Sequence, residues 1–139
     1  VVVVRPDIAR AIIAQLGFTT WENSEPADYP GSFWLSYGEL EYVESESAAG
    51  VIRTTYLYGD IEILALEMSL EELDTFAHYR DTSKGCHDFI TLSNGLICEY
   101  WHDDDSSLAI VTGQNAFVIC ADHIPLNDYI KLLSSIIEV

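Results

Sequence analysis

DFITLSNGLICEYW, residues 88–101, is the stretch that decides how this chain is expected to fold. Apolar and polar residues alternate on both sides of Asn94-Gly95, a dipeptide that supplies the positive φ angles of a two-residue hairpin turn. Such a turn sets the register, because both strands must pair outward from it. We therefore predict that Phe89 faces Tyr100 and that the second strand runs over residues 96–102.

The same kind of pattern continues to the end of the chain. After a turn in DDDS, strands are predicted at residues 108–112 and 117–121, with a Gly-Gln-Asn turn between them. Pro125 then opens a helix, because proline is favoured in the first turn and apolar residues recur after it with helical spacing. Residues 88–138 are therefore predicted to form a ββββα unit.

Residues 33–80 predict a second unit of the same kind. The helix in this half begins with a capping box, Ser69 and Glu72. Before it, strands are predicted at residues 33–36, 39–43, 51–57 and 61–67, and an acidic loop at 44–50. LSYG in this half matches LSNG in the other, and EY at 41–42 matches EY at 99–100. We interpret the two halves as an internal duplication.

The predicted fold class is α+β, in a single domain over residues 1–139. Residues 1–32 are expected to hold a helix and a loop, because Pro6 stands near a helix start and Gly17 where a C-terminal cap belongs. An N-terminal helix would thus be followed by two ββββα units of antiparallel meanders, with the helices packed on one face of the sheet. The pattern leaves open whether the two halves share one sheet.

The charge balance narrows the choice of partner. There are 23 acids and 6 bases, which gives a formal charge of −17. From Glu22 to Asp74 the chain has thirteen acids and a single base, Arg53. Such a field repels phosphate backbones and anionic lipid headgroups, so neither nucleic acid nor a membrane is the expected partner. It favours a basic protein, because complementary fields speed encounter.

Apolar runs and cysteines indicate the compartment. No stretch reaches the roughly 18 apolar residues that a membrane span needs. Three cysteines without the spacing of a disulfide framework favour a reducing environment. We therefore expect a cytoplasmic protein, whose oligomeric state the sequence leaves open.

Motifs for metal, cofactor or catalytic chemistry are weak in this sequence. A calcium loop that began at Asp103 would need glycine at its sixth position, which is Leu108. Cys98 and His102 are roughly 13 Å apart along a strand, too far to share a zinc ion. Cys86-His87-Asp88 has the residue types of a thiol nucleophile, but neighbours in a strand point to opposite faces. We expect no metal, no cofactor and no enzyme activity.

The remaining possibility is that the chain binds another protein, because aromatic residues are interleaved with acids in EYVESES (41–47) and EYWHDDDSS (99–107). Aromatic side chains anchor interfaces, whereas acids steer the encounter. Trp101 is expected on a polar face that it shares with Glu99. The predicted partner-binding residues are Glu41, Tyr42, Glu44, Glu46, Trp101, His102, Asp103, Asp104 and Asp105.

This profile resembles that of small, acidic bacterial immunity proteins, which bind and block a basic toxin such as a nuclease. The resemblance implies a tight one-to-one complex in which carboxylates take the place of nucleic-acid phosphates. It is one of profile and rests on no diagnostic motif. A secretion chaperone that holds a client is the alternative, and would show apolar grooves on a dimer. A small cysteine enzyme using Cys86 is a third reading, and would show a thiol of depressed pKa in an open cleft.

Overall fold

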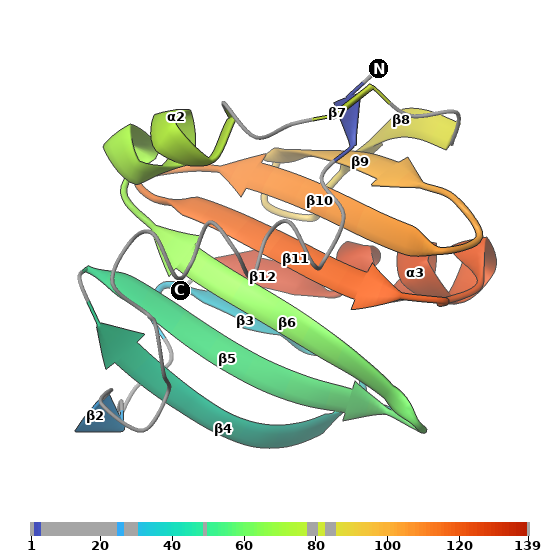
Figure 1. Ribbon diagram of the computed structural model, residues 1–139, viewed down its shortest axis with the longest axis horizontal. Helices are drawn as coiled ribbons and strands as arrows, with labels where there is room; N and C mark the ends of the chain where they lie inside the picture. Colours follow the sequence, from blue (N-terminus) through green and yellow to red (C-terminus); the bar gives the residue numbers. More distant parts are fainter. Residues whose placement is uncertain are drawn as a thin grey trace.

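The computed structural model describes residues 2–3, 25–26, 31–48, 50–77, 81–82 and 86–138, which form a mostly β structure (Figure 1). The described helices are α2 (Leu70–Ala77) and α3 (Leu126–Ser134). The described strands are β1 (Val2–Val3), β2 (Glu25–Pro26), β3 (Phe33–Leu35), β4 (Glu41–Ala48), β5 (Val51–Tyr58), β6 (Ile61–Met68), β7 (Asp81–Thr82), β8 (Cys86–Thr91), β9 (Ile97–His102), β10 (Ser106–Thr112), β11 (Ala116–Asp122) and β12 (Ile136–Glu138).

One antiparallel sheet of eight strands organises these residues, in the order β2-β4-β5-β6-β11-β10-β9-β8. The two halves of the chain therefore share one sheet, joined where β6 pairs with β11. On either side of that pair, β5 and β4 mirror β10 and β9. Two smaller pairs, β1 with β7 and β3 with β12, complete the described strands.

The predicted α+β fold of two equivalent ββββα units is wrong. β3 leaves the large sheet and pairs with β12, a strand that we did not predict, whereas β8 stays in the large sheet. The helices are not on one face either, because α3 packs in one buried cluster and Leu73 of α2 packs against another. The helix predicted near the N-terminus, at residues 6–17, lies outside the described residues.

Both faces of the large sheet bury apolar side chains, so β10 and β11 are buried at nearly every position. The face that α3, β3 and β12 cover is here called the α3 face; these elements lie behind the sheet in Figure 1. Its core includes Phe33, Tyr56, Ile63, Phe117, Ile119, Tyr129 and Leu132. On the opposite face, a second cluster includes Leu64, Leu66, Met68, Trp101, Leu108, Ile110 and Val118.

The hairpin at Asn94-Gly95 forms with a register one residue away from the prediction. Phe89 pairs with Glu99, not with Tyr100. The N–H of Gly95 donates to the carbonyl of Leu92 at 2.9 Å, and the N–H of Leu92 donates to the carbonyl of Leu96 at 2.8 Å, which encloses three loop residues. Gly95 alone supplies the positive φ, at 88°. A three-residue loop of this kind shifts the register because one more residue stays unpaired.

Candidate functional site

The acidic segment that was predicted as a loop at 44–50 continues the strand instead, since β4 extends to Ala48. Its pairing with β5 shifts between Tyr42 and Glu44, so that Val43 is the extra residue of a β-bulge. Beyond the bulge, the side chains of β4 again alternate between the two faces of the sheet, but shifted by one residue. As a result, Tyr42 and Ser45 lie on the α3 face, while Glu44 and Glu46 lie on the opposite face.

Aromatic rings gather beside the bulge on the α3 face. Tyr42 lies 5.5 Å from Trp34 and 5.9 Å from Tyr56, and Trp34 lies 5.9 Å from Tyr56, between ring centroids. Tyr56 is fully buried, and burial raises its pKa to about 12, so its hydroxyl stays neutral. Tyr42 is 43% exposed and presents the open side of the cluster.

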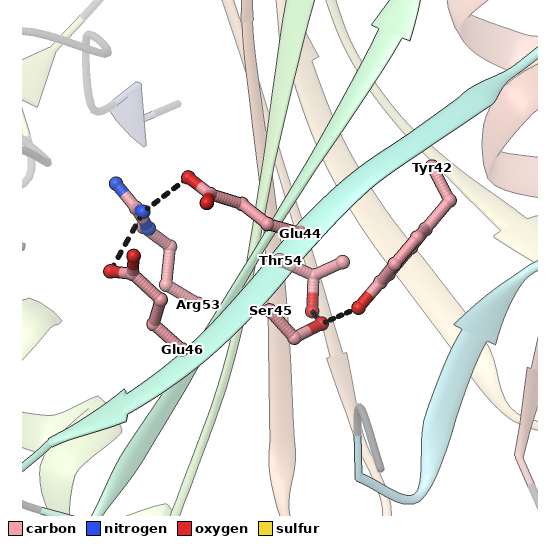
Figure 2. Close-up of polar contacts among 6 residues, drawn as sticks. All are labelled: Tyr42, Glu44, Ser45, Glu46, Arg53 and Thr54. Carbon is pink, nitrogen blue, oxygen red and sulfur yellow. Dashed lines mark hydrogen bonds and ion pairs between the residues drawn. The ribbon is translucent and has the colours of Figure 1, made fainter. Parts of the chain in front are cut away.

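A chain of hydroxyl groups holds the Tyr42 ring in place. The Tyr42 hydroxyl donates to Ser45 Oγ at 2.8 Å, and Ser45 Oγ lies 2.8 Å from Thr54 Oγ1 on β5 (Figure 2). Ser45 and Thr54 are both buried. An exposed aromatic ring that is already fixed loses little side-chain entropy when a partner covers it.

On the opposite face of the same strands, Arg53 bridges two carboxylates. Its Nη2 donates to Glu44 Oε1 at 3.1 Å and to Glu46 Oε2 at 2.9 Å (Figure 2). Burial lowers the pKa of Arg53, against the attraction of Glu46, Glu44 and Glu62. One guanidinium cannot neutralise three carboxylates, so this end of the sheet keeps a negative charge. The Glu44 side chain is 52% exposed and remains accessible to a partner.

We call the residues Trp34, Glu41, Tyr42, Val43, Glu44 and Glu46 the β4 surface. Glu41, Tyr42, Val43 and Glu44 are exposed, and Val43 at 46% is an exposed apolar side chain next to Tyr42 in the strand. The arrangement offers fixed carboxylates on one face of β4 and an aromatic anchor on the other. Such a surface is suited to protein contact.

Trp101 and His102, which we expected at the surface, are buried. Trp101 is 2% exposed and stacks on His87 with ring centroids 5.0 Å apart. His102 is 9% exposed, and its Nε2 donates to the carbonyl of Ile124 at 2.7 Å. Trp101 does share a face with Glu99, but only the Trp101 end of that face is buried, while Glu99 is partly exposed and Ile97 is exposed. Alternation within one hairpin does not indicate this difference. We remove both residues from the predicted surface.

The aspartates at the β9–β10 turn are separate from the β4 surface. Asp103 shapes the turn, because its Oδ1 accepts the N–H groups of Asp105 and Ser106, both at 2.8 Å. Asp104 and Asp105 are exposed. Four strands lie between β4 and β9, so the two acidic segments are roughly 24 Å apart across the sheet. The predicted residues therefore form two acidic sites and not one.

An open pocket of about 440 Å³ adjoins this turn, lined by His102, Asp104, His123, Ile124, Pro125 and Leu126. His123 has a positive φ of 56°, and its backbone N–H donates to the carbonyl of Asp105 at 3.2 Å. The imidazole of His102 is already bonded to the Ile124 carbonyl. Within the described ranges, no three His, Cys, Asp or Glu side chains are grouped so that they could hold a metal ion.

The three cysteines in the described part of the chain are free thiols in different surroundings. Cys98 and Cys120 are buried, and burial raises the pKa of Cys98 to about 12, which keeps it a thiol. Cys86 is exposed and lies opposite His102 in the β8–β9 register. Its side chain is hydrogen-bonded to the Tyr100 hydroxyl. His87 points to the other face, where it pairs with Glu99 at 2.9 Å.

Sequence reasoning missed Val43 and the role of Arg53 at this site. A bulge leaves no local signal in EYVESES, because it depends on how β4 pairs with β5. The single base among thirteen acids was visible in the sequence and could have pointed to an internal ion pair, since a lone cation in such a field attracts carboxylates.

Comparisons with known proteins add no relative. No family model, no curated protein and no solved structure matches this chain. Neither of the helices described above is long and apolar enough to cross a membrane.

Proposed function

We propose that this protein is a non-catalytic binding domain for a basic protein, and that the β4 surface is where the partner docks. The observation that carries the proposal is the pairing of two features on one strand. Carboxylates held by Arg53 lie on one face of β4, and the fixed, half-exposed ring of Tyr42 lies on the other. Together they supply the steering charge and the aromatic anchor that protein interfaces use.

The negative charges are expected to act mainly on the rate of association with the partner. At physiological salt the field of the acids extends about 8 Å beyond the surface, far enough to orient a cationic partner during its last approach. Arg53 fixes the positions of Glu44 and Glu46 before the partner arrives. Glu41 and the exposed side of Glu44 then remain to pair with the partner's lysine or arginine side chains.

We further propose that the partner is a basic toxin, and that the protein acts as an immunity protein. The support for this finer statement is the acidic profile together with the compact acidic and aromatic β4 surface. Carboxylates there would occupy the positions that nucleic-acid phosphates take in a nuclease. A toxin partner predicts that the protein suppresses the toxin's activity at a one-to-one ratio, which an activity titration measures.

Charge reversal at the β4 surface is expected to slow association. The variant combines Glu41→Lys of the β4 surface with Glu39→Lys, at an exposed residue just before β4. It changes the net charge by +4, as does the matched control Asp104→Lys/Asp105→Lys at the distant turn. We expect the first variant to lower the association rate about tenfold at low salt, and the control to lower it much less. The partner is first captured from the native host on the immobilised protein and purified, and stopped-flow rates are then measured across a salt series. Equal losses of rate in the two variants would refute the β4 surface.

Removal of the Tyr42 ring is expected to act on dissociation. Tyr42→Ala should raise the dissociation rate about 30-fold, because an anchor residue contributes roughly 2 kcal/mol. Tyr42→Phe keeps the ring and loses only the bond to Ser45, so its rate should stay within about threefold of the wild type. Phe89→Ala is a matched control, since Phe89 is an exposed aromatic residue on β8, at the other end of the sheet. A wild-type dissociation rate for Tyr42→Ala would exclude Tyr42 from the interface.

A further inference from the structure

The two ends of the large sheet are protected to different degrees. At one end, β4 has the Val43 bulge, three carboxylates, and the short strand β2 with Pro26 beside it. These are devices that prevent a sheet edge from pairing with another chain. At the other end, β8 pairs with β9 through six consecutive residue pairs without a bulge, and it contains neither proline nor lysine.

β8 also presents apolar side chains to solvent. Phe89 on β8 is 56% exposed, and Ile97 on β9 is 57% exposed. Both lie on the same face of the sheet, because Phe89 pairs with Glu99 and Thr91 pairs with Ile97. They are the two most exposed of the large apolar side chains in the described residues. An edge of this kind is ready to accept another strand.

The charge at β8 differs from that at β4. Glu99 beside Phe89 is paired with His87 at 2.9 Å, and Asp88 is the one acid of β8 itself. A basic partner is therefore not attracted here as it is at the β4 surface. A second copy of this chain, which the acidic β4 edge would repel, meets little repulsion at β8.

We propose that β8 pairs with β8 of a second copy, antiparallel and about a two-fold axis at Phe89. Phe89 then faces Phe89 of the other copy, His87 faces Thr91, and Asp88 faces Ile90. Aromatic pairs directly across two strands are stabilising. A two-fold axis at Asp88 would instead place two carboxylates opposite each other, which disfavours that register.

The overall charge supports this arrangement over other ways of joining two copies. Each chain has a charge of −17, so self-association is possible only where the acids are kept apart. With β8 at the junction, thirteen strand spacings separate the two β4 strands along the joined sheet, which is roughly 60 Å. Screening removes any repulsion between the two β4 surfaces at that distance. The dimer would display one β4 surface at each end.

The test uses the purified chain alone, so its outcome does not depend on the proposed function. Sedimentation velocity is measured from 1 μM to 1 mM at two salt concentrations. We expect a monomer–dimer equilibrium that added salt does not weaken, and at least a tenfold weaker dimer for Phe89→Glu. Val43→Glu is the matched control, because Val43 is 46% exposed on β4, near the opposite end of the sheet, and it should dimerise like the wild type.

The register is tested by cross-linking in a Cys86→Ser background. Phe89→Cys should form a disulfide-linked dimer under mild oxidation, because residues directly opposite each other have Cβ atoms within reach of a disulfide. Asp88→Cys should not, since its counterpart is displaced by two residues. A wild-type chain that stays monomeric at 1 mM, equal weakening by Val43→Glu and Phe89→Glu, or cross-linking at Asp88→Cys and not at Phe89→Cys would each overturn the proposal.

Discussion

Glu67→Ala is expected to lower the free energy of unfolding by about 3 kcal/mol, because it deprives buried donors of their charged acceptor. Glu67 is 4% exposed on β6. Its carboxylate accepts the N–H of Ser32 at 2.8 and 3.0 Å, the N–H of Phe33 at 2.9 Å, and Nδ2 of Asn115 at 3.3 Å. The backbone packs closely over this group, and a Cβ on Gly31, where φ is 105°, would collide with it.

Removal of the Glu67 carboxylate is also expected to affect the candidate site. The bonds to Ser32 and Phe33 hold the start of β3, and the next residue is Trp34 of the β4 surface. Glu67→Gln keeps one acceptor oxygen, so its effect should be about half as large. Urea unfolding measures the stability, and partner affinity measures the displacement of Trp34. Wild-type stability for Glu67→Ala would show that these backbone groups find other partners.

Arg53→Met is expected to lower the free energy of unfolding by about 3 kcal/mol, because it leaves the largely buried carboxylate of Glu46 without its cation. The Arg53 side chain is 8% exposed, and the Glu46 side chain is 16% exposed. Methionine keeps the apolar volume of the arginine stem, so the loss measures charge and hydrogen bonding more than packing. Urea unfolding at neutral pH provides the measurement.

Replacement of both glutamates by neutral glutamine provides the control for Arg53→Met. In Arg53→Met/Glu44→Gln/Glu46→Gln, the repelling carboxylates are gone, and most of the lost stability should return. Arg53→Lys should be intermediate, because an ammonium group lacks the planar fork that reaches both carboxylates. If the triple variant were as unstable as Arg53→Met, the role of Arg53 would lie in packing, and the preorganisation of Glu44 and Glu46 would lose its support.

Local pattern predicted the elements well where one signal was sufficient. The strands that became β5, β6, β10 and β11, and the starts of α2 and α3, lie within one or two residues of their predicted positions. The errors arose where the structure of a segment depends on the strand with which it pairs. β12 follows α3 directly, and Ile136 and Ile137 continue the apolar spacing of the helix, so they gave no separate strand signal. The alternation of Glu and Ser at 44–47 is a strand pattern that the high charge concealed.

The residues of the β4 surface were chosen in part from the sequence, and their role in binding stays a prediction. Tyr42 and its neighbouring glutamates were identified from the interleaving of aromatic and acidic residues, and they form the β4 surface. Trp101 directly follows the matching EY of the second half, yet it is buried. Exposure depends on which segments pack over each face of the sheet. Two strands in equivalent positions can be covered by different segments.

The sequence by itself determined the charge, the alternation of most strands and the place of the turns, because these depend on residues next to one another in the chain. Only the tertiary structure decided that β3 leaves the large sheet, that the hairpin shifts by one residue, and that Arg53 joins two glutamates of β4. Each of these outcomes rests on contacts between segments far apart in the chain. Which contact forms depends on the difference in free energy between alternative partners, and a local sequence pattern does not contain that information.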